Sequence, residues 1–409
     1  MYTLLREHAN YLGSHAANFA SQLVKTPSPS LCENEVARSV QRKMDELGYD
    51  KVFVDDFGNV FGIIYGTESS PVILLNSHMD TIVPGKDDPE WQLPLYSGEI
   101  VNGKLNGIGS ADCKGGLAAQ IYAGYLLKRT LLPLRGTLIV AATVSEENGL
   151  SLGVQHLLSK TLPEMKMKVD YAVLGEPTDL GLFYGHDGWV EYRLGMDASN
   201  SDMLRDAANT VFRNLIEAGM IRRTPGSLEL MSVEEPKDNS ENGQVYIDFS
   251  RRISFGDDAD KLAAELKEFS LSNVSRRAGI NASINVHEET QNLQNGEKIQ
   301  VRYLSDAWET DPFSPLMDRA REALTSAGCK ARPGKWRLPQ LGMGTAGSTL
   351  TKRFNIPTIG YGPGKEDVAH AANEYVEVDK ITECVLGTAS IVHSLVGIPV
   401  FGWTSDMEI

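Results

Sequence analysis

The 409-residue sequence has little cysteine, and its cysteines follow no recognisable pattern. Cys32, Cys113, Cys329 and Cys384 are scattered along the chain, without a C-x-x-C pair and without the dense spacing of a disulfide framework. This usage is typical of proteins from a reducing compartment. We therefore expect a cytoplasmic location.

Long apolar segments and an excess of basic residues are also missing. No apolar run approaches the roughly 18 residues that would span a bilayer, and MYTLLREHANYLG does not have the basic and apolar halves of a signal peptide. Lys and Arg number 39 against 54 Asp and Glu, which gives a formal net charge of -15. Because like charges repel, this balance disfavours nucleic acid and anionic membranes as partners and leaves small molecules open.

Two common enzyme signatures do not occur either. There is no G-x-S-x-G elbow of an α/β serine hydrolase. GIGSAD, at 107–112, lacks the third glycine and the preceding strand of a dinucleotide-binding loop. The length, without repeats or low-complexity tracts, predicts two or three globular folding units.

The first part of the sequence alternates helical and strand patterns. In SLCENEVARSVQRKMDELGY, Ser30 and Glu33 have the spacing of a capping box, and a helix is predicted up to Gly48. The segments KVFVDD, VFGIIY, PVILLNSH, TLIVAATVS and YAVLGE predict strands, and KGGLAAQIYAGYLLKR predicts a helix. Strands that are apolar on both faces and alternate with helices predict an α/β domain with a mostly parallel sheet sandwiched by helices.

The pattern changes after Gly185. Residues 186–295 show the order β-α-β-β-α-β of a ferredoxin-like α+β domain. We expect this segment to be an inserted lid domain, with NLQNGEK as its exit linker. Residues 1–185 and 296–409 would then form one discontinuous catalytic domain.

Five motifs carry acidic or imidazole side chains, three of them at expected strand ends, where ligands gather in α/β sheets, and two in loops. They are His78 and Asp80 in LLNSHMDT, Asp112 in GIGSADCKGG, Glu146 and Glu147 in VSEENG, Glu176 in LGEPT, and His370 in DVAHAANEY. Residues i and i+2 of a strand share a face, so Asp80 could accept one ring N–H of His78 and direct the other nitrogen to a metal.

Each motif also has an ordinary structural interpretation. His78 could lie in a hydrogen-bonded polar cluster, Asp112 could cap a helix, and Glu146 with Glu147 could lie in a solvated turn. The last two motifs could be a turn carboxylate and a surface histidine. However, adjacent carboxylates at a buried strand end repel each other unless a cation lies between them or one is protonated. Together the five motifs offer the N and O donors that suit zinc, cobalt or manganese.

In order and spacing these motifs resemble the M20 metallopeptidase family of amidohydrolases, which includes acetylornithine deacetylase, succinyl-diaminopimelate desuccinylase, carboxypeptidase G and aminoacylases. The resemblance covers nearly the whole chain. GHDGWVEY and IPTIGYGPGKEDVAHAANEYV are most similar to the branch of the selenium-metabolism hydrolases. The resemblance implies a metallohydrolase that cleaves the amide bond of an N-acyl amino acid, a dipeptide or a related small molecule.

The resemblance also implies two divalent metal ions, zinc first, with cobalt or manganese as alternatives. His78 and Glu176 would hold one ion, Glu147 and His370 the other, and Asp112 would bridge them.

Two further residues of the same motifs would act beside the metals. Asp80 would orient His78, and Glu146 would be the general base that moves a proton from water to the leaving amine.

The residues that would bind substrate are implied by two other segments. GMGTAGSTL, at 342–350, resembles a loop that contacts the substrate carboxylate, with Thr345, Gly347 and Ser348 as the binding residues, although it could also be a simple helix start. In YIDFSRRISFG, Arg252 resembles an arginine of the family's lid domain, although two solvated surface arginines would give the same pattern.

One segment departs from the family. The lid of family members carries an A-H-S motif whose histidine, in dimers, reaches the partner's active site. Here RLGMDASNSDMLRDAANTVF contains no histidine, and GHDG has Asp187 where relatives tend to have arginine. Two hypotheses follow. The chain is either an active hydrolase whose oxyanion is stabilised by another donor or by the metals alone, or a metal-binding relative that lost ordinary peptidase turnover and serves binding or regulation. A homodimer through the lid domain is possible under both.

Overall fold

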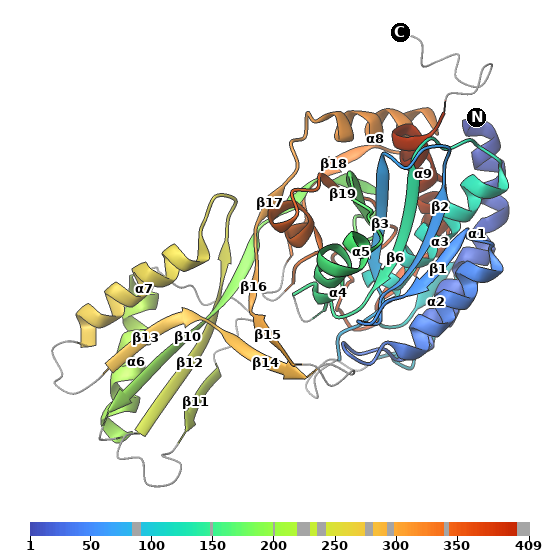
Figure 1. The fold of residues 1–409 in the computed structure, drawn as a ribbon. Helices are drawn as coiled ribbons and strands as arrows, with labels where there is room; N and C mark the ends of the chain where they lie inside the picture. Colours follow the sequence, from blue (N-terminus) through green and yellow to red (C-terminus); the bar gives the residue numbers. More distant parts are fainter. Residues whose placement is uncertain are drawn as a thin grey trace. The chain divides into compact units, whose positions relative to one another are not determined.

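The structure is a computed structural model, and it describes residues 1–83, 91–147, 150–198, 201–218, 230–234, 243–274, 281–292, 298–338 and 343–398. They form two compact units (Figure 1): Met1–His186 with Trp308–Arg337 and Thr345–Ile409, and Asp187–Ala307 with Leu338–Gly344. The domain boundaries at 186 and 295 stay a prediction. Most of the expected linker NLQNGEK, and Gly342 of GMGTAGSTL, lie outside the described residues.

The described part of the first unit is built on a sheet of eight strands in the order β1-β2-β6-β3-β7-β19-β8-β18. The central strands β6, β3, β7 and β19 are parallel, whereas the pairs β1-β2, β2-β6 and β8-β19 are antiparallel. Every residue of β3 and β6 is buried, as their continuous apolar sequences predict. The strands are β1 Lys51–Val54, β2 Val60–Tyr65, β3 Val72–His78, β6 Thr137–Thr143, β7 Tyr171–Leu174, β8 Gly181–Phe183, β18 Arg332–Gly334 and β19 Thr358–Gly360.

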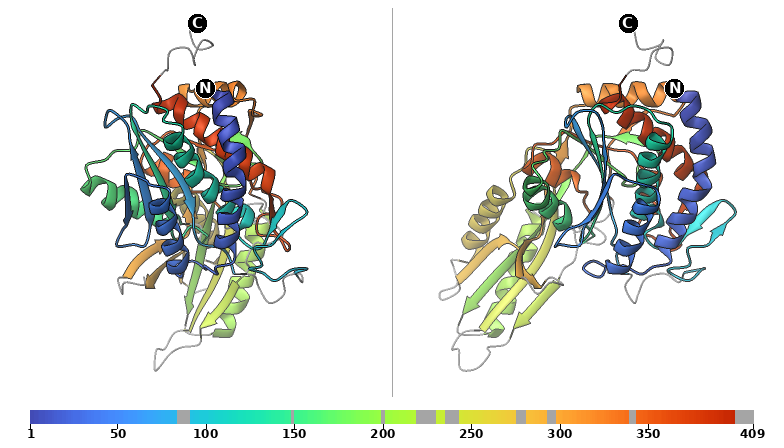
Figure 2. Two further views of the ribbon diagram at one scale, coloured as in Figure 1. Left: turned by 90° about the vertical axis from the view of Figure 1, so that its right-hand side faces the viewer. Right: turned by 45° about the vertical axis from the view of Figure 1, so that its right-hand side comes forward.

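Helices cover both faces of this sheet (Figure 2), which confirms the predicted α/β class. Helices α1, α3 and α9 pack against one another on one face, and α4 and α5 lie on the other. Helix α1 was not predicted from the sequence. The helices are α1 Tyr2–Val24, α2 Asn34–Glu46, α3 Gly115–Arg129, α4 Leu152–His156, α5 Leu162–Glu164, α8 Pro315–Ser326 and α9 Val378–Val396.

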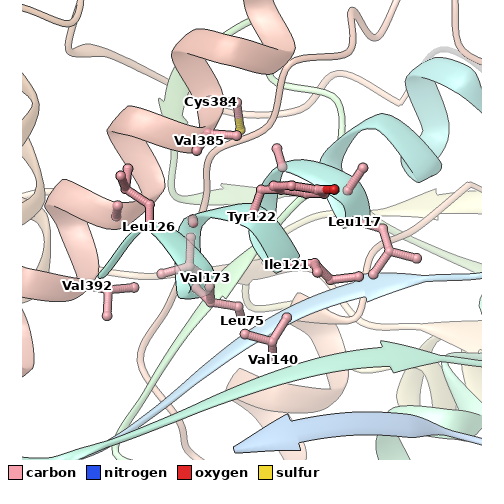
Figure 3. Packing of buried hydrophobic residues seen from close by; sticks show 14 of the residues in the cluster. Leu75, Leu117, Ile121, Tyr122, Leu126, Val140, Val173, Cys384, Val385 and Val392 are labelled. Carbon is pink, nitrogen blue, oxygen red and sulfur yellow. The ribbon is translucent and has the colours of Figure 1, made fainter. Parts of the chain in front are cut away.

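The main core lies between α3, α9 and the sheet (Figure 3). Side chains from β3, β6 and β7 meet those of the two helices, and all of them are buried: Leu75, Val140, Val173, Leu117, Ile121, Leu126, Val385 and Val392. Full burial of such a side chain contributes about 1.5–3 kcal/mol. Gly116 allows this packing, because a Cβ atom there would lie 1.9 Å from the carbonyl oxygen of Gly175, just after β7.

Short strand pairs complete the first unit. β4 Ile100–Val101, β5 Lys104–Asn106 and β20 Tyr375–Glu377 form one small sheet, and β9 Gly185–His186 pairs with β17 Trp308–Glu309. Within the described ranges, no helix combines the length and apolar character that crossing a bilayer requires.

The second unit has the predicted order β10-α6-β11-β12-α7-β13, and its antiparallel sheet has the ferredoxin-like order β11-β12-β10-β13. Tyr192, Leu194, Phe249 and Ile284 of the sheet share one core with residues of α6 and α7. The elements are β10 Gly188–Ala198, α6 Ser201–Glu217, β11 Leu230–Glu234, β12 Gly243–Ile253, α7 Ala259–Val274, β13 Asn281–Val286, β14 Glu288–Asn292, β15 Lys298–Arg302 and β16 Leu304–Ser305. Its role as a lid or dimerisation domain stays a prediction.

Candidate metal centre

Three neighbouring strands bring three of the motifs to one edge of the sheet. β3 pairs in parallel with β6 on one side and with β7 on the other, so the carboxyl ends of the three strands coincide. His78 is the last residue of β3, Glu146 and Glu147 follow β6, and Glu176 follows β7. The carboxyl ends of all three strands are buried, and the polar residues that end or follow them lie close together.

Asp112 and His370 reach the same place from loops. Asp112 precedes α3, and His370 precedes β20 in a left-handed conformation with a φ of 59°. Oδ1 of Asp112 lies 3.1 Å from Nε2 of His78, and Oδ2 lies 3.4 Å from Nε2 of His370. The two oxygens of one carboxylate therefore face two different histidines.

A second carboxylate accompanies each histidine. Oε2 of Glu176 lies 3.8 Å from Nε2 of His78, and Oε2 of Glu147 lies 2.9 Å from Nε2 of His370. Two ligand groups result: His78, Asp112 and Glu176, with the Cys113 thiol beside them, and Asp112, Glu147 and His370. Within each group the possible ligand atoms lie within 4.8 Å of one another. The structure thus brings together all five residues expected to bind metal.

The charges of the centre fit a pair of divalent cations. Burial, together with the neighbouring Glu176 carboxylate, raises the pKa of Glu146 well above its usual value. Burial also raises the pKa of Glu176 to about 7. For His370, burial acts to lower the pKa, but the adjacent Glu147 carboxylate outweighs it and raises the pKa to about 10. So many buried acidic groups are costly unless cations neutralise them, and the imidazole and carboxylate donors suit zinc, cobalt or manganese.

Asp80 makes different contacts from those expected. The nearer partner of Nδ1 of His78 is the backbone carbonyl of Asp80, at 2.8 Å, whereas the Asp80 carboxylate is 3.6 Å away. The carboxylate instead accepts the backbone N–H groups of Glu146 and Glu147, each at 2.9 Å from Oδ2. Asp80 therefore fixes the backbone of both glutamates, and its main chain orients the histidine.

The capping box predicted for Ser30 and Glu33 is wrong. Glu33 is the N-cap residue of α2, but it makes no side-chain hydrogen bond to that helix. Its Oε1 accepts the backbone N–H groups of Leu31 and Ser145, both at 2.9 Å, and the Ser30 hydroxyl donates to Oδ2 of Asp80 at 2.7 Å. Ser30 and Glu33 therefore bond to residues beside the centre instead of to the first turn of α2.

Two buried charged residues next to the centre were not found from the sequence. The Glu374 carboxylate accepts the backbone N–H groups of Ala111 and Asp112, at 2.8 and 3.1 Å. The ammonium of Lys114 donates to two carbonyl oxygens near the end of α1. An acidic residue directly before strand β20, only four residues after His370, was the available signal for Glu374.

The residues expected to bind substrate fall into both units. In the first unit, Nε2 of His186 lies 2.9 Å from Oγ1 of Thr345 and accepts the Thr345 backbone N–H at 3.1 Å. The N–H of Gly347 donates to the Thr345 hydroxyl, and the N–H of Ser348 to the Thr345 carbonyl. In the second unit, the guanidinium of Arg252 donates to the carbonyl of Leu338.

Comparisons with known proteins give one family and one fold. The family model of peptidase family M20/M25/M40 matches residues 74–394. The chain is 26% identical to protein YgeY of Escherichia coli (strain K12), over 95% of this chain and 96% of YgeY. It is 25% identical to the N-formyl-4-amino-5-aminomethyl-2-methylpyrimidine deformylase of Bacillus subtilis (strain 168), over 88% and 89% of the two chains. Among solved structures, the Bacillus subtilis YxeP protein, described as a dinuclear metal binding peptidase from the M20 family, has a TM-score of 0.67 at 14% identity, with 94% of this chain and 98% of YxeP covered.

Proposed function

Because the chain belongs to peptidase family M20/M25/M40 and is thus a metal-dependent hydrolase of amide or peptide bonds, we propose that it cleaves a small N-acyl compound. The substrate class is an N-acyl amino acid, a dipeptide or a related small molecule. The observation that carries the proposal is the position of Asp112, whose two oxygens face the two ligand groups. A single carboxylate with this placement suits two cations held side by side.

We assign one divalent ion to His78, Asp112 and Glu176, and a second to Asp112, Glu147 and His370. Zinc is the first choice, with cobalt or manganese as alternatives. When bound, the ions polarise the scissile carbonyl and acidify a water molecule.

Glu146 is the residue that we assign as general base. It is buried but belongs to neither ligand group, so its carboxylate is available for proton transfer. Its environment raises its pKa, so the carboxylate can take up a proton from the attacking water and hand it to the leaving amine. Asp80 holds its backbone, and the Ser151 hydroxyl lies 3.4 Å from Oε1.

The proposal also covers the size of the substrate, the residues that bind it and the cellular location of the protein. The Bacillus subtilis relative is named as a deformylase of an N-formyl compound, which is a small amide. Thr345, Gly347 and Ser348 would receive the substrate carboxylate. Arg252, in the second unit, is proposed as a substrate-binding residue from the resemblance alone. The four cysteines are free thiols, which supports a cytoplasmic location.

A second candidate function follows from residues 193–212, which contain no histidine where the resemblance implies one. Under this alternative the chain binds two metal ions and a small ligand but serves as a binding or regulatory protein. Glu146 favours the hydrolase, because a binding protein does not need a general base.

The test combines metal analysis with a substrate screen. Wild type, Glu146→Gln and the control Glu164→Gln, an exposed carboxylate on α5, are loaded with zinc, cobalt or manganese and assayed on N-acyl amino acids and dipeptides. We expect two ions per chain in all three proteins and a rate about 10²–10⁴-fold lower in Glu146→Gln alone. Two ions without Glu146-dependent turnover would select the binding protein. Absence of stoichiometric metal after reconstitution would refute both functions.

A further inference from the structure

The loop between α1 and α2 reaches two strand ends of the metal centre. The hydroxyl of Ser28 in this loop donates to the carbonyl of Met79 at 2.8 Å. The backbone carbonyl of Ser28 accepts the N–H of Thr81 at 2.9 Å. Pro29 forms a parallel bridge with Thr81. This part of the loop is therefore paired with the segment that directly follows His78.

The next residues of the loop contact the glutamate pair from two sides. The Ser30 hydroxyl donates to Oδ2 of Asp80, the same oxygen that accepts the N–H groups of Glu146 and Glu147. Oε1 of Glu33 accepts the N–H of Ser145, the residue immediately before Glu146. One short loop thus controls the backbone on both sides of the peptide group of Glu146.

The conformation of Ser145 explains why such control is needed. Ser145 has a left-handed φ of 57°, which is unfavourable for a residue with a side chain. Its side chain is fully buried, and its N–H is held by the buried Glu33 carboxylate. A conformation of this kind persists only when the surrounding contacts impose it.

The presence of a glutamate at position 33 also indicates that this side chain holds the backbone near Glu146. A buried carboxylate is costly, and Glu33 makes no compensating bond to the helix that it precedes. Both hydrogen bonds of Oε1 go to backbone N–H groups, one of them 112 residues away along the chain. Packing alone would be better served by an apolar side chain of similar size.

We propose that Ser30 and Glu33 are positioning residues that hold Glu146 and Glu147 in their working directions, Ser30 through Asp80 and Glu33 through Ser145. The proposal rests on the proposed function, because it gives these residues a purpose only if Glu146 moves a proton and Glu147 binds metal. Their loss leaves the ligands present but less well directed. Outer contacts of this kind typically change activity or metal affinity by about 10–100-fold.

The test uses Ser30→Ala, Glu33→Gln and Glu33→Ala, with two residues of α2 as controls, the exposed Glu35 and the half-buried Ser39. Glu35→Gln removes a carboxylate that pairs with Arg38, and Ser39→Ala removes a hydroxyl that donates to the Glu35 carbonyl. Each protein is loaded with Co²⁺, and its visible absorption spectrum, metal stoichiometry, kcat and KM are measured. We expect Ser30→Ala and Glu33→Ala to lower kcat about 10–100-fold with KM changed less than about twofold. Glu33→Gln should retain more activity than Glu33→Ala, because an amide oxygen still accepts an N–H.

Two readouts separate positioning from a general loss of structure. The Co²⁺ spectrum should change in Ser30→Ala and Glu33→Ala but not in the controls, while the far-ultraviolet circular dichroism stays that of wild type. In a Glu146→Gln background, Ser30→Ala should lower kcat less than it does in wild type, because the part of its effect that acts through Glu146 is already lost. Loop variants whose kcat and spectra match the controls would overturn the proposal. If wild type shows no Glu146-dependent turnover, the proposed function fails, and the Co²⁺ spectra still decide whether the loop directs Glu147.

Discussion

Metal binding to the stripped protein should release at least about two protons per chain at pH 7.5, one from each histidine of the centre. Burial acts to lower the pKa of His370, but the Glu147 carboxylate outweighs it and raises the pKa to about 10. Burial acts in the same direction on His78, where the Glu176 and Asp112 carboxylates favour the charged ring and the pKa is raised well above its usual value. An imidazole nitrogen binds a metal only when it is neutral, so each ring must lose a proton.

The magnitude follows from these pKa values. With a pKa of about 10, His370 is more than about 99% protonated at pH 7.5 in the metal-free protein, and His78 contributes a second proton. Glu176, with a pKa of about 7, adds roughly a quarter of a proton. Because the pKa values of the histidines are raised, the number of protons released on metal binding falls as the pH rises through about 10. The apparent affinity for metal stops increasing over the same range.

The assay is isothermal titration of Zn²⁺ into chelator-treated protein, in buffers of equal pH and different ionisation enthalpy. The slope of the observed enthalpy against the ionisation enthalpy of the buffer gives the number of protons released. His370→Ala should bind one ion and release about one proton fewer. The control His15→Gln, an exposed histidine on α1, should match wild type in both numbers.

Two results would refute the reasoning. A release below about half a proton in wild type would mean that the histidines are not protonated neighbours of the carboxylates. An unchanged release in His370→Ala would mean that this imidazole does not bind metal, whatever its distance from Glu147 and Asp112.

Three further predictions concern the first unit. Burial lowers the pKa of His393 from its usual 6.5 to about 4, so the free energy of unfolding should fall by up to about 3 kcal/mol as the pH falls through that window. Urea denaturation at pH 7.5 and 4.5 should show a smaller fall in His393→Gln, and an equal fall would contradict the cause. Leu75→Ala, at a fully buried position of β3, should cost about 2–5 kcal/mol in guanidinium denaturation, and a cost below about 1 kcal/mol would place Leu75 outside the core. Gly116→Ala puts a Cβ atom 1.9 Å from the Gly175 carbonyl, so expression should yield insoluble protein or protein that fails to bind two ions, whereas full metal content would refute the clash.

The meeting of the candidate ligands at one place could be predicted because it depends on a rule of sheet architecture. Parallel neighbours end at one edge, so His78 after β3, Glu147 after β6 and Glu176 after β7 had to meet once these strands were recognised. The strands themselves were recognisable from continuous apolar runs. The ferredoxin-like order of the second unit followed in the same way from alternating patterns.

The contacts that support the ligands could not be predicted, because a local pattern does not reveal a distant partner. Ser30 and Glu33 have the spacing of a capping box, yet their partners are Asp80 and Ser145. For Asp80, the spacing to His78 indicated a contact between the two side chains. The carboxylate instead accepts hydrogen bonds from two backbone N–H groups that follow another strand. Helix α1 was not predicted, although its buried residues Leu5, Leu12 and Phe19 recur at a helical spacing of seven.

The order of the ligands along the chain sets when the centre can form during synthesis. Four ligands precede the second unit, whereas His370 emerges from the ribosome roughly 190 residues after Glu176, about 10–40 s later at ordinary rates of translation. Strand β19, which lies between β7 and β8 in the finished sheet, is made in the same late interval. A nascent chain therefore carries the acidic half of the centre without its second imidazole, and we expect hydrolysis to begin only after nearly the whole polypeptide has been made.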